Sequence, residues 1–278
     1  MSLSAYPALD EVLRDHAHAL RRVLADDFVG VYPLGSLAVG DFDLTSDVDF
    51  VVVVADEPSE AQVASVQAVH TDTLRRGDRW VRRLEYSLFP LPQLLQLTSP
   101  YASEGQRDDA PHRRLWYFNN GSPTLERSDH DNTLVTRWTL RSNSRAILGP
   151  EPDEFAPEVS ADALRSEIRG SMLGWEQLVL TDPAPLENRF HQVFLVLNNC
   201  RALQDLHEGR ITSKREGVAW AREHLDIEWQ ALIEFCWRER QDTGIHISQP
   251  ADPRAFRRTI EFMQYTARLA ETYQPPRR

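Results

Sequence analysis

Two aspartates one residue apart, Asp47 and Asp49, stand at the start of an apolar run, and Gly35-Ser36 precedes them by ten intervening residues. Side chains at positions i and i+2 of a strand point to the same face, so the two carboxylates are expected to converge. Convergent carboxylates repel each other unless a cation lies between them, and oxygen-only ligands favour Mg²⁺. We therefore expect Asp47 and Asp49 to be metal ligands.

The small residues before the aspartates suggest a turn that contacts phosphate. Gly35 lets the backbone approach a ligand closely, and the Ser36 hydroxyl and neighbouring N–H groups offer donors to phosphate oxygens. Ser46 is expected either to contact the same phosphates or only to close the turn before the strand. The spacing predicts that the turn binds a triphosphate while the aspartates hold two Mg²⁺ ions that neutralise its charge.

A third carboxylate is expected on a neighbouring strand, and Glu85 in the segment RRLEYSLF is the candidate. A glutamate inside an apolar strand is unusual unless it has a partner. It could be a metal ligand, a general base that deprotonates a hydroxyl, or both. The adjacent Arg82 and Arg83 offer a different explanation, in which Glu85 only forms a salt bridge.

The first half of the chain alternates between helical and extended segments. Residues 48–55, VDFVVVVA, form a continuous β-branched run that is typical of a buried strand. Other strands are expected at residues 28–34 and 80–89, and helices at residues 7–25 and 58–76. This alternation predicts an α/β domain whose mixed sheet is flanked by helices.

The chain becomes helical from about Ser160 onward. Residues 189–207 are apolar on much of their circumference, which is typical of a buried central helix, and Gly209 is placed to cap it. Prolines concentrate in residues 148–160, which marks a domain boundary. We expect an α/β domain over residues 1–156 and an all-α helical bundle over residues 157–278.

Composition and charge restrict the partners. The formal net charge is −11 and no long Lys/Arg run is present, so nucleic acid is not an expected partner, whereas a cationic small molecule is. No apolar run is long enough to cross a membrane, and the N-terminal residues lack a signal-peptide pattern. The two cysteines lie in apolar segments, as reduced core thiols do. We expect a cytoplasmic monomer.

Gly35-Ser36, ten residues and then Asp47-x-Asp49 resemble the signature of the DNA polymerase β-like nucleotidyltransferases. The C-terminal half resembles the helical domain of aminoglycoside adenylyltransferases of the streptomycin/spectinomycin class. The matching residues of that half occur in the same order and at close to the same spacing, and they are Leu197, Arg201, Gly209, Lys214 and Trp220.

The resemblance implies ATP as co-substrate, bound between the two domains. The family's arginine and lysine that contact the nucleotide phosphates correspond to Arg201 and Lys214, and its catalytic base corresponds to Glu85. An arginine on a largely buried helix needs an anionic partner, and a triphosphate is one. A tyrosine that the family carries near the end of its nucleotide site is replaced in this sequence, around Arg240.

The acceptor site is matched less closely. The resemblance suggests Trp116 and Trp175 as tryptophans of the acceptor pocket. A family aspartate shortly after the second tryptophan favours streptomycin, but Leu180 stands near that position here and Asp182 is displaced from it. The segment from Pro90 to Asp131 looks longer than in the family.

A further family aspartate corresponds to either Asp129 or Asp131, with no basis in the sequence for choosing. The resemblance implies transfer of AMP from ATP to a hydroxyl of an aminoglycoside or aminocyclitol, with release of pyrophosphate. Two alternatives remain open: the same chemistry on a metabolite or protein hydroxyl, and a nucleotide-binding regulatory module without turnover.

Overall fold

The structure is a computed structural model that describes residues 3–101 and 110–275. It divides into two compact units: apart from Tyr101, which groups with the second unit, the described residues up to Val159 form the first and those from Ser160 form the second. The expected boundary was residue 156. Each unit is described by itself. Among the described residues, no helix combines the length and apolarity needed to cross a membrane.

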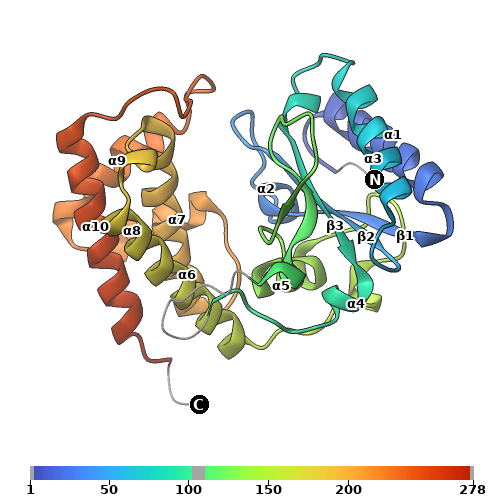
Figure 1. Ribbon diagram of the computed structural model, residues 1–278. Helices are drawn as coiled ribbons and strands as arrows, with labels where there is room; N and C mark the ends of the chain where they lie inside the picture. The colour runs from blue at the N-terminus through green and yellow to red at the C-terminus, as the bar shows by residue number, and fades with distance from the viewer. Residues whose placement is uncertain (1–2, 102–109, 276–278) are drawn as a thin grey trace. The chain divides into compact units, whose positions relative to one another are not determined.

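The first unit contains a five-stranded mixed sheet (Figure 1). The strands follow the order β1-β2-β3-β4-β5, and only the β2–β3 pair is parallel. The strand bounds are β1 (Phe28–Pro33), β2 (Val48–Val54), β3 (Leu84–Pro90), β4 (Leu115–Phe118) and β5 (Glu126–Ser128). The predicted mixed sheet with flanking helices is confirmed.

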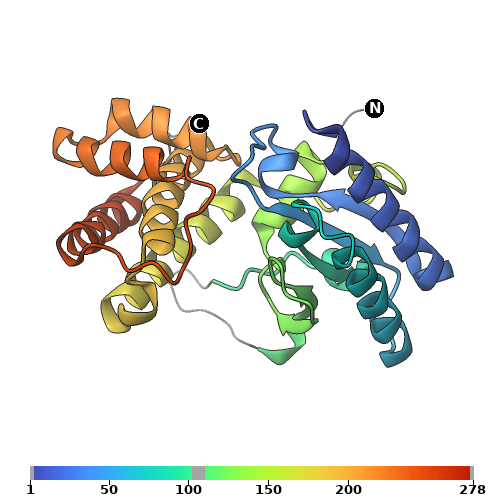
Figure 2. The same cartoon turned by 90° about the horizontal axis from the view of Figure 1, so that it is seen from above.

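Two apolar layers cover the sheet. Helices α1 (Pro7–Leu24) and α3 (Glu60–Leu74) lie side by side over one face (Figure 2). The other face packs against residues of α5 (Leu134–Asn143) and of the chain that follows it, through Leu140 and Phe155. Because strand residues alternate between faces, Phe50 and Tyr86 enter the α1/α3 layer while their neighbours face α5.

Short helices complete this unit. Helix α2 (Gly35–Ala38) follows β1, and α4 (Leu91–Leu94) follows β3. The strand expected at residues 80–89 begins only at Leu84, because Val81–Arg83 form a 3₁₀ turn. Trp80 and Val81 are nevertheless buried in the α1/α3 layer, which explains why their apolar character resembled that of a strand.

The second unit is helical. Its helices are α6 (Ala161–Thr181), α7 (Arg189–Glu208), α8 (Lys214–His224), α9 (Gln230–Glu239) and α10 (Pro253–Thr272). Helix α7 packs against the other four, so the predicted central helix is confirmed. It ends at Gly209, which adopts a left-handed conformation with φ 68°. A capping box of Ser213 and Glu216 begins α8.

Candidate active site

The turn after β1 lies against the start of β2. The two strands pair antiparallel with Pro33 opposite Phe50, and the Leu34 N–H donates to the Asp49 carbonyl oxygen at 2.8 Å. Gly35 has φ 50°, and a Cβ at this position would overlap the Asp49 carboxylate. Glycine is therefore required on two grounds, its left-handed backbone and the close approach of a carboxylate.

The loop before β2 is held by its own polar groups. Asp43 Oδ1 accepts hydrogen bonds from the Thr45 N–H at 2.8 Å and from the Ser46 hydroxyl at 3.2 Å. Arg83 donates to the carbonyl oxygens of Leu44, at 2.8 Å, and of Ser46, at 3.0 Å. Ser46 is buried. Of the two roles expected for Ser46, these hydrogen bonds favour closing the turn before the strand. Arg83 donates to backbone carbonyl oxygens here and not to the Glu85 carboxylate.

Three carboxylates gather at the edge where β2 and β3 begin. Asp49 and Glu85 are register partners in the parallel pair, so their Cα atoms are about 5 Å apart and their side chains share a face. Asp47 lies two residues before Asp49 and accepts a hydrogen bond from the Asn120 side-chain amide at 2.5 Å. The structure thus brings together Asp47, Asp49 and Glu85 as the sequence predicts, with Gly35 beside them.

Only 14% of the Glu85 side chain is exposed. The Tyr117 hydroxyl donates to its Oε1 at 2.6 Å, and His130 Nε2 lies 3.3 Å from the same oxygen. Burial raises the pKa of Glu85, the His130 and Tyr117 interactions lower it, and the charges of Asp131 and Asp47 raise it further. A carboxylate with a raised pKa is better suited to accept a proton than an exposed one.

Asp131, one of the two aspartates between which the sequence offered no choice, belongs to this network. Its Oδ2 accepts a hydrogen bond from the Ser87 hydroxyl at 2.6 Å, and Ser87 is two residues after Glu85 on β3. Burial raises the pKa of Asp131, while His130 and the Ser87 hydrogen bond lower it. The sequence left this choice open because neither aspartate lies in a recognisable local pattern.

The segment from Pro90 to Asp131 contributes to the site rather than merely interrupting the chain. It contains β4 and β5, and β4 places Tyr117 opposite Ser87 on the face that carries Glu85. Tyr117, Asn120 and His130 were not predicted. The short run LWYF at residues 115–118 was the available signal for β4, but a four-residue strand is too short for periodicity to identify.

The carboxylate edge fits a hard divalent cation by its chemistry, because all of its charged donors are oxygens. Among residues 3–101 and 110–275, however, no three Asp, Glu, His or Cys side chains form a metal-binding group. Mg²⁺ commonly takes one or two carboxylates together with substrate phosphates. Asp47 and Asp49 match that arrangement, whereas Glu85 is directed to Tyr117 and His130.

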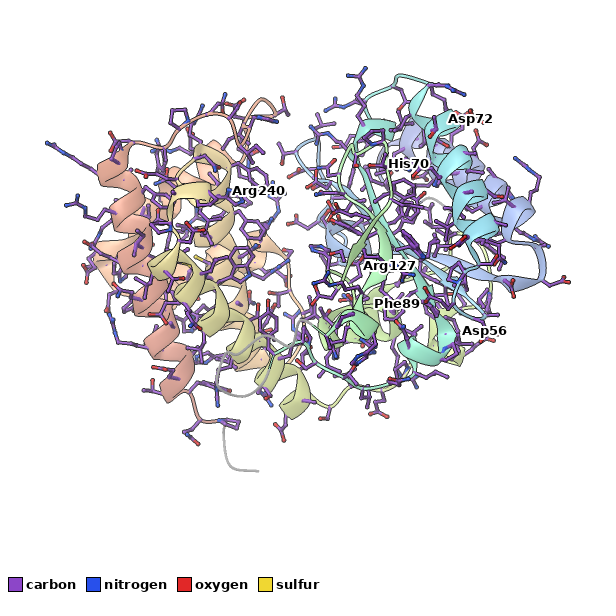
Figure 3. The ribbon with its side chains drawn as sticks, viewed as in Figure 1. Asp56, His70, Asp72, Phe89, Arg127 and Arg240 are labelled. Atoms are coloured by element: carbon purple, nitrogen blue, oxygen red, sulfur yellow. The ribbon has the colours of Figure 1, made fainter. Side chains whose placement is uncertain are left out.

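Trp116 is not brought to this site. In β4 it alternates with Tyr117, so it faces the α1/α3 layer on the opposite side of the sheet from Glu85. The guanidinium of Arg127, which is labelled in Figure 3, lies over the Trp116 ring, 4.1 Å from the ring centroid. This geometry does not support a role for Trp116 in an acceptor pocket beside Glu85.

The predicted phosphate ligands of the second unit lie on two helices that pack together. Arg201 is half-buried on α7. On the same helix, the pKa of Asp205 is raised to about 7, because the effect of burial outweighs the opposing effect of the Arg201 charge. A Cβ at Gly217 of α8 would lie 2.5 Å from the Arg201 Cα, so Gly217 permits close packing there. Lys214 is the first residue of α8, and its Nζ is 5.7 Å from the Phe194 ring centroid.

The other expected acceptor residues lie on or beside α6. Trp175 is half-buried, and its ring meets Phe194 edge-on with centroids 5.4 Å apart. Trp175 and Lys214 therefore contact the same aromatic ring. Asp182 caps the C-terminus of α6 and is exposed, as is Leu180. Arg240 follows α9, with its guanidinium 5.6 Å from the Trp237 ring centroid (Figure 3).

Comparisons with known proteins agree with both units. Residues 156–264 match the family described as the C-terminal domain of aminoglycoside adenylyltransferase. The spectinomycin 9-adenylyltransferases of Staphylococcus aureus strains Mu50 and N315 are each 24% identical to the chain over 226 residues, which cover 78% of this chain and 79% of theirs. The crystal structure of the spectinomycin adenyltransferase AAD(9) from Enterococcus faecialis, with ATP and spectinomycin, matches with a TM-score of 0.64.

That structural match has 17% sequence identity and covers 90% of this chain and 96% of AAD(9), so it supports the fold. The predicted resemblance and the predicted enzyme class, a nucleotidyltransferase, are confirmed by these matches together. Each relative just described is an adenylyltransferase, which disfavours a module without turnover.

Proposed function

We propose that this protein, whose helical unit is that of the aminoglycoside adenylyltransferases, transfers AMP from ATP to a hydroxyl group of an aminocyclitol or aminoglycoside of the spectinomycin/streptomycin kind. The observation that carries the proposal is the juxtaposition of Asp49 with Glu85 across β2 and β3, beside the Gly35 turn. Three carboxylates meet there: the aspartate pair would hold a cation, and Glu85, whose side chain is 14% exposed, would take a proton.

The proposed reaction has one bond-forming and one bond-breaking event at phosphorus. The acceptor hydroxyl gives its proton to Glu85 while its oxygen bonds to the α-phosphorus of ATP. The bond between that phosphorus and the oxygen bridging to the β-phosphate breaks, and pyrophosphate leaves. Two features of Glu85 support this role. Burial raises its pKa, and its Oε1 accepts a hydrogen bond from the Tyr117 hydroxyl and lies 3.3 Å from His130 Nε2.

The remaining residues bind and orient the nucleotide in this proposal. Asp47 and Asp49 would hold Mg²⁺, which supplies positive charge against the triphosphate when it is bound. The Gly35-Ser36 turn, Arg201 and Lys214 would contact phosphate oxygens. The number of Mg²⁺ ions, predicted as two, and the monomeric state stay predictions.

Spectinomycin is the first acceptor to examine, because the relatives described above are spectinomycin enzymes. Leu180, which is exposed, stands near the position at which the family carries an aspartate that favours streptomycin. This difference also favours spectinomycin as the acceptor. Release of pyrophosphate should be measured with ATP, Mg²⁺ and either spectinomycin or streptomycin. We expect release with spectinomycin above the background rate of ATP alone. Release with neither compound would overturn the proposed acceptor and favour a metabolite or protein hydroxyl.

A further inference from the structure

The two carboxylate oxygens of Glu85 have different surroundings. Oε1 receives the Tyr117 hydroxyl at 2.6 Å and lies 3.3 Å from His130 Nε2. Within residues 3–101 and 110–275, no side chain or backbone group donates a hydrogen bond to Oε2. One oxygen is thus held by the protein, and the other remains available to a ligand.

Tyr117 is built into the sheet as a rigid donor. It stands opposite Ser87 in the β3–β4 pair and is 5% exposed. The His130 ring stacks on its ring with centroids 5.3 Å apart and an interplanar angle of 27°. A buried tyrosine has few accessible rotamers, so its hydroxyl is fixed relative to Glu85 by the strand pairing.

We propose that Tyr117 is a positioning residue, whose hydroxyl holds Glu85 Oε1 so that Oε2 is the oxygen that takes the acceptor proton. This inference rests on the proposed function, in which Glu85 is the base. Tyr117 acts through Glu85 and does not itself exchange a proton with the acceptor. His130, exposed and stacked on Tyr117, supports the same orientation.

The orientation of a base affects the rate more than it affects substrate binding. A general base must lie within hydrogen-bond reach of the proton that it removes, and a small misplacement lowers the population of reactive complexes. A hydrogen bond to a charged group is among the stronger ones in proteins. Loss of the Tyr117 hydroxyl is therefore expected to lower kcat by about tenfold to a hundredfold.

The test compares Tyr117→Phe with Tyr86→Phe. Tyr86 is the neighbour of Glu85 on β3, but its side chain faces the α1/α3 layer, where its hydroxyl lies 3.2 Å from His16 Nε2. Both changes remove one buried phenol oxygen from the same sheet. We expect Tyr117→Phe to lower kcat while the KM values for ATP and acceptor change by less than about threefold. Tyr86→Phe should keep the wild-type kcat. Equal kcat in Tyr117→Phe and wild type would overturn the proposal.

Crystal structures of the wild type and of Tyr117→Phe provide a readout that needs no turnover. We expect a single Glu85 side-chain conformation in the wild type and a second one in the variant. An unchanged, single conformation in the variant would overturn the proposal. If the wild type transfers AMP to no acceptor, the proposed function fails, and these two structures still decide whether Tyr117 positions Glu85.

Discussion

Asp49 and Glu85 face each other across the parallel strands β2 and β3. Two carboxylates at this distance repel each other when both are ionised, and one is usually kept protonated or neutralised. Strand register, rather than favourable packing, places them together. In the proposed reaction Asp49 would help to hold a cation, while Glu85 would take a proton.

Replacing Gly35 with alanine tests whether the turn and Asp49 act as a unit. The new Cβ would overlap the Asp49 carboxylate and would sit at φ 50°. We expect Gly35→Ala to weaken Mg²⁺-dependent ATP binding by tenfold or more, measured by isothermal titration calorimetry, on the order of 1.4 kcal/mol or more in binding free energy.

Gly40→Ala is the matched control for that change. Gly40 also has a positive φ, 75°, but a Cβ there would meet no atom within 4 Å. Both variants pay for the left-handed backbone, about 1–2 kcal/mol in folding stability. Only Gly35→Ala should lose ATP affinity. Equal affinities in the two variants would show that the contact with Asp49 does not matter for binding.

Removing the amine of Lys214 should weaken nucleotide binding without removing the chemistry. We expect Lys214→Ala to raise the KM for ATP by about tenfold, since a charge-assisted hydrogen bond to phosphate would be lost. Steady-state kinetics with varied ATP provide the measurement. Arg222→Ala, at the other end of α8 and paired with Glu234 at 2.6 Å, is the control. A KM change of the same size in Arg222→Ala would point to loss of net charge rather than to a specific contact.

Two buried histidines make the first unit sensitive to acid. Burial lowers the pKa of His16 to about 3 and of His70 to about 4, and each ring also faces Tyr86. His16 contacts the Thr73 hydroxyl at 2.9 Å. Figure 3 shows His70 pointing from α3 toward the sheet, whereas Asp72 of the same helix points outward.

In the unfolded chain these histidines should titrate near pH 6.5. Below that pH the unfolded state binds more protons than the folded state, so stability is full above about pH 6.5 and falls as the pH drops toward the folded pKa values. We expect a lower urea midpoint at pH 5 than at pH 7.5, followed by circular dichroism. His16→Gln should reduce this difference, while the exposed His18→Gln should leave it as in the wild type. An unchanged difference in His16→Gln would contradict the assignment.

Features with a local cause could be predicted from the sequence. The β-branched run at Val48–Val54 forms a strand, and Asp252 and Pro253 begin α10 as N-cap and first residue. Gly209 ends α7 because a left-handed residue is needed there. The placement of Asp49 and Glu85 at one edge also followed from strand alternation and from the expectation of neighbouring strands.

Features that depend on distant pairing could not be predicted in this way. Strand β4 has four residues and exists because β3 pairs with it, and β5 carries exposed polar side chains. Tyr117 and His130 reach Glu85 only through that pairing. Trp116 was expected near the acceptor by its position in the chain, but the alternation of β4 turns it to the opposite face.

We propose that Glu85 takes the acceptor proton during AMP transfer at this edge of the sheet. Mass spectrometry of spectinomycin after incubation with ATP, Mg²⁺ and either wild type, Glu85→Gln or Glu126→Gln tests it most directly, with Glu126 chosen as an exposed glutamate of β5. We expect an AMP adduct with the wild type and Glu126→Gln, and a rate reduced by about a hundredfold or more with Glu85→Gln, which should still bind ATP. An adduct formed equally fast by Glu85→Gln would contradict the role of Glu85 as the base.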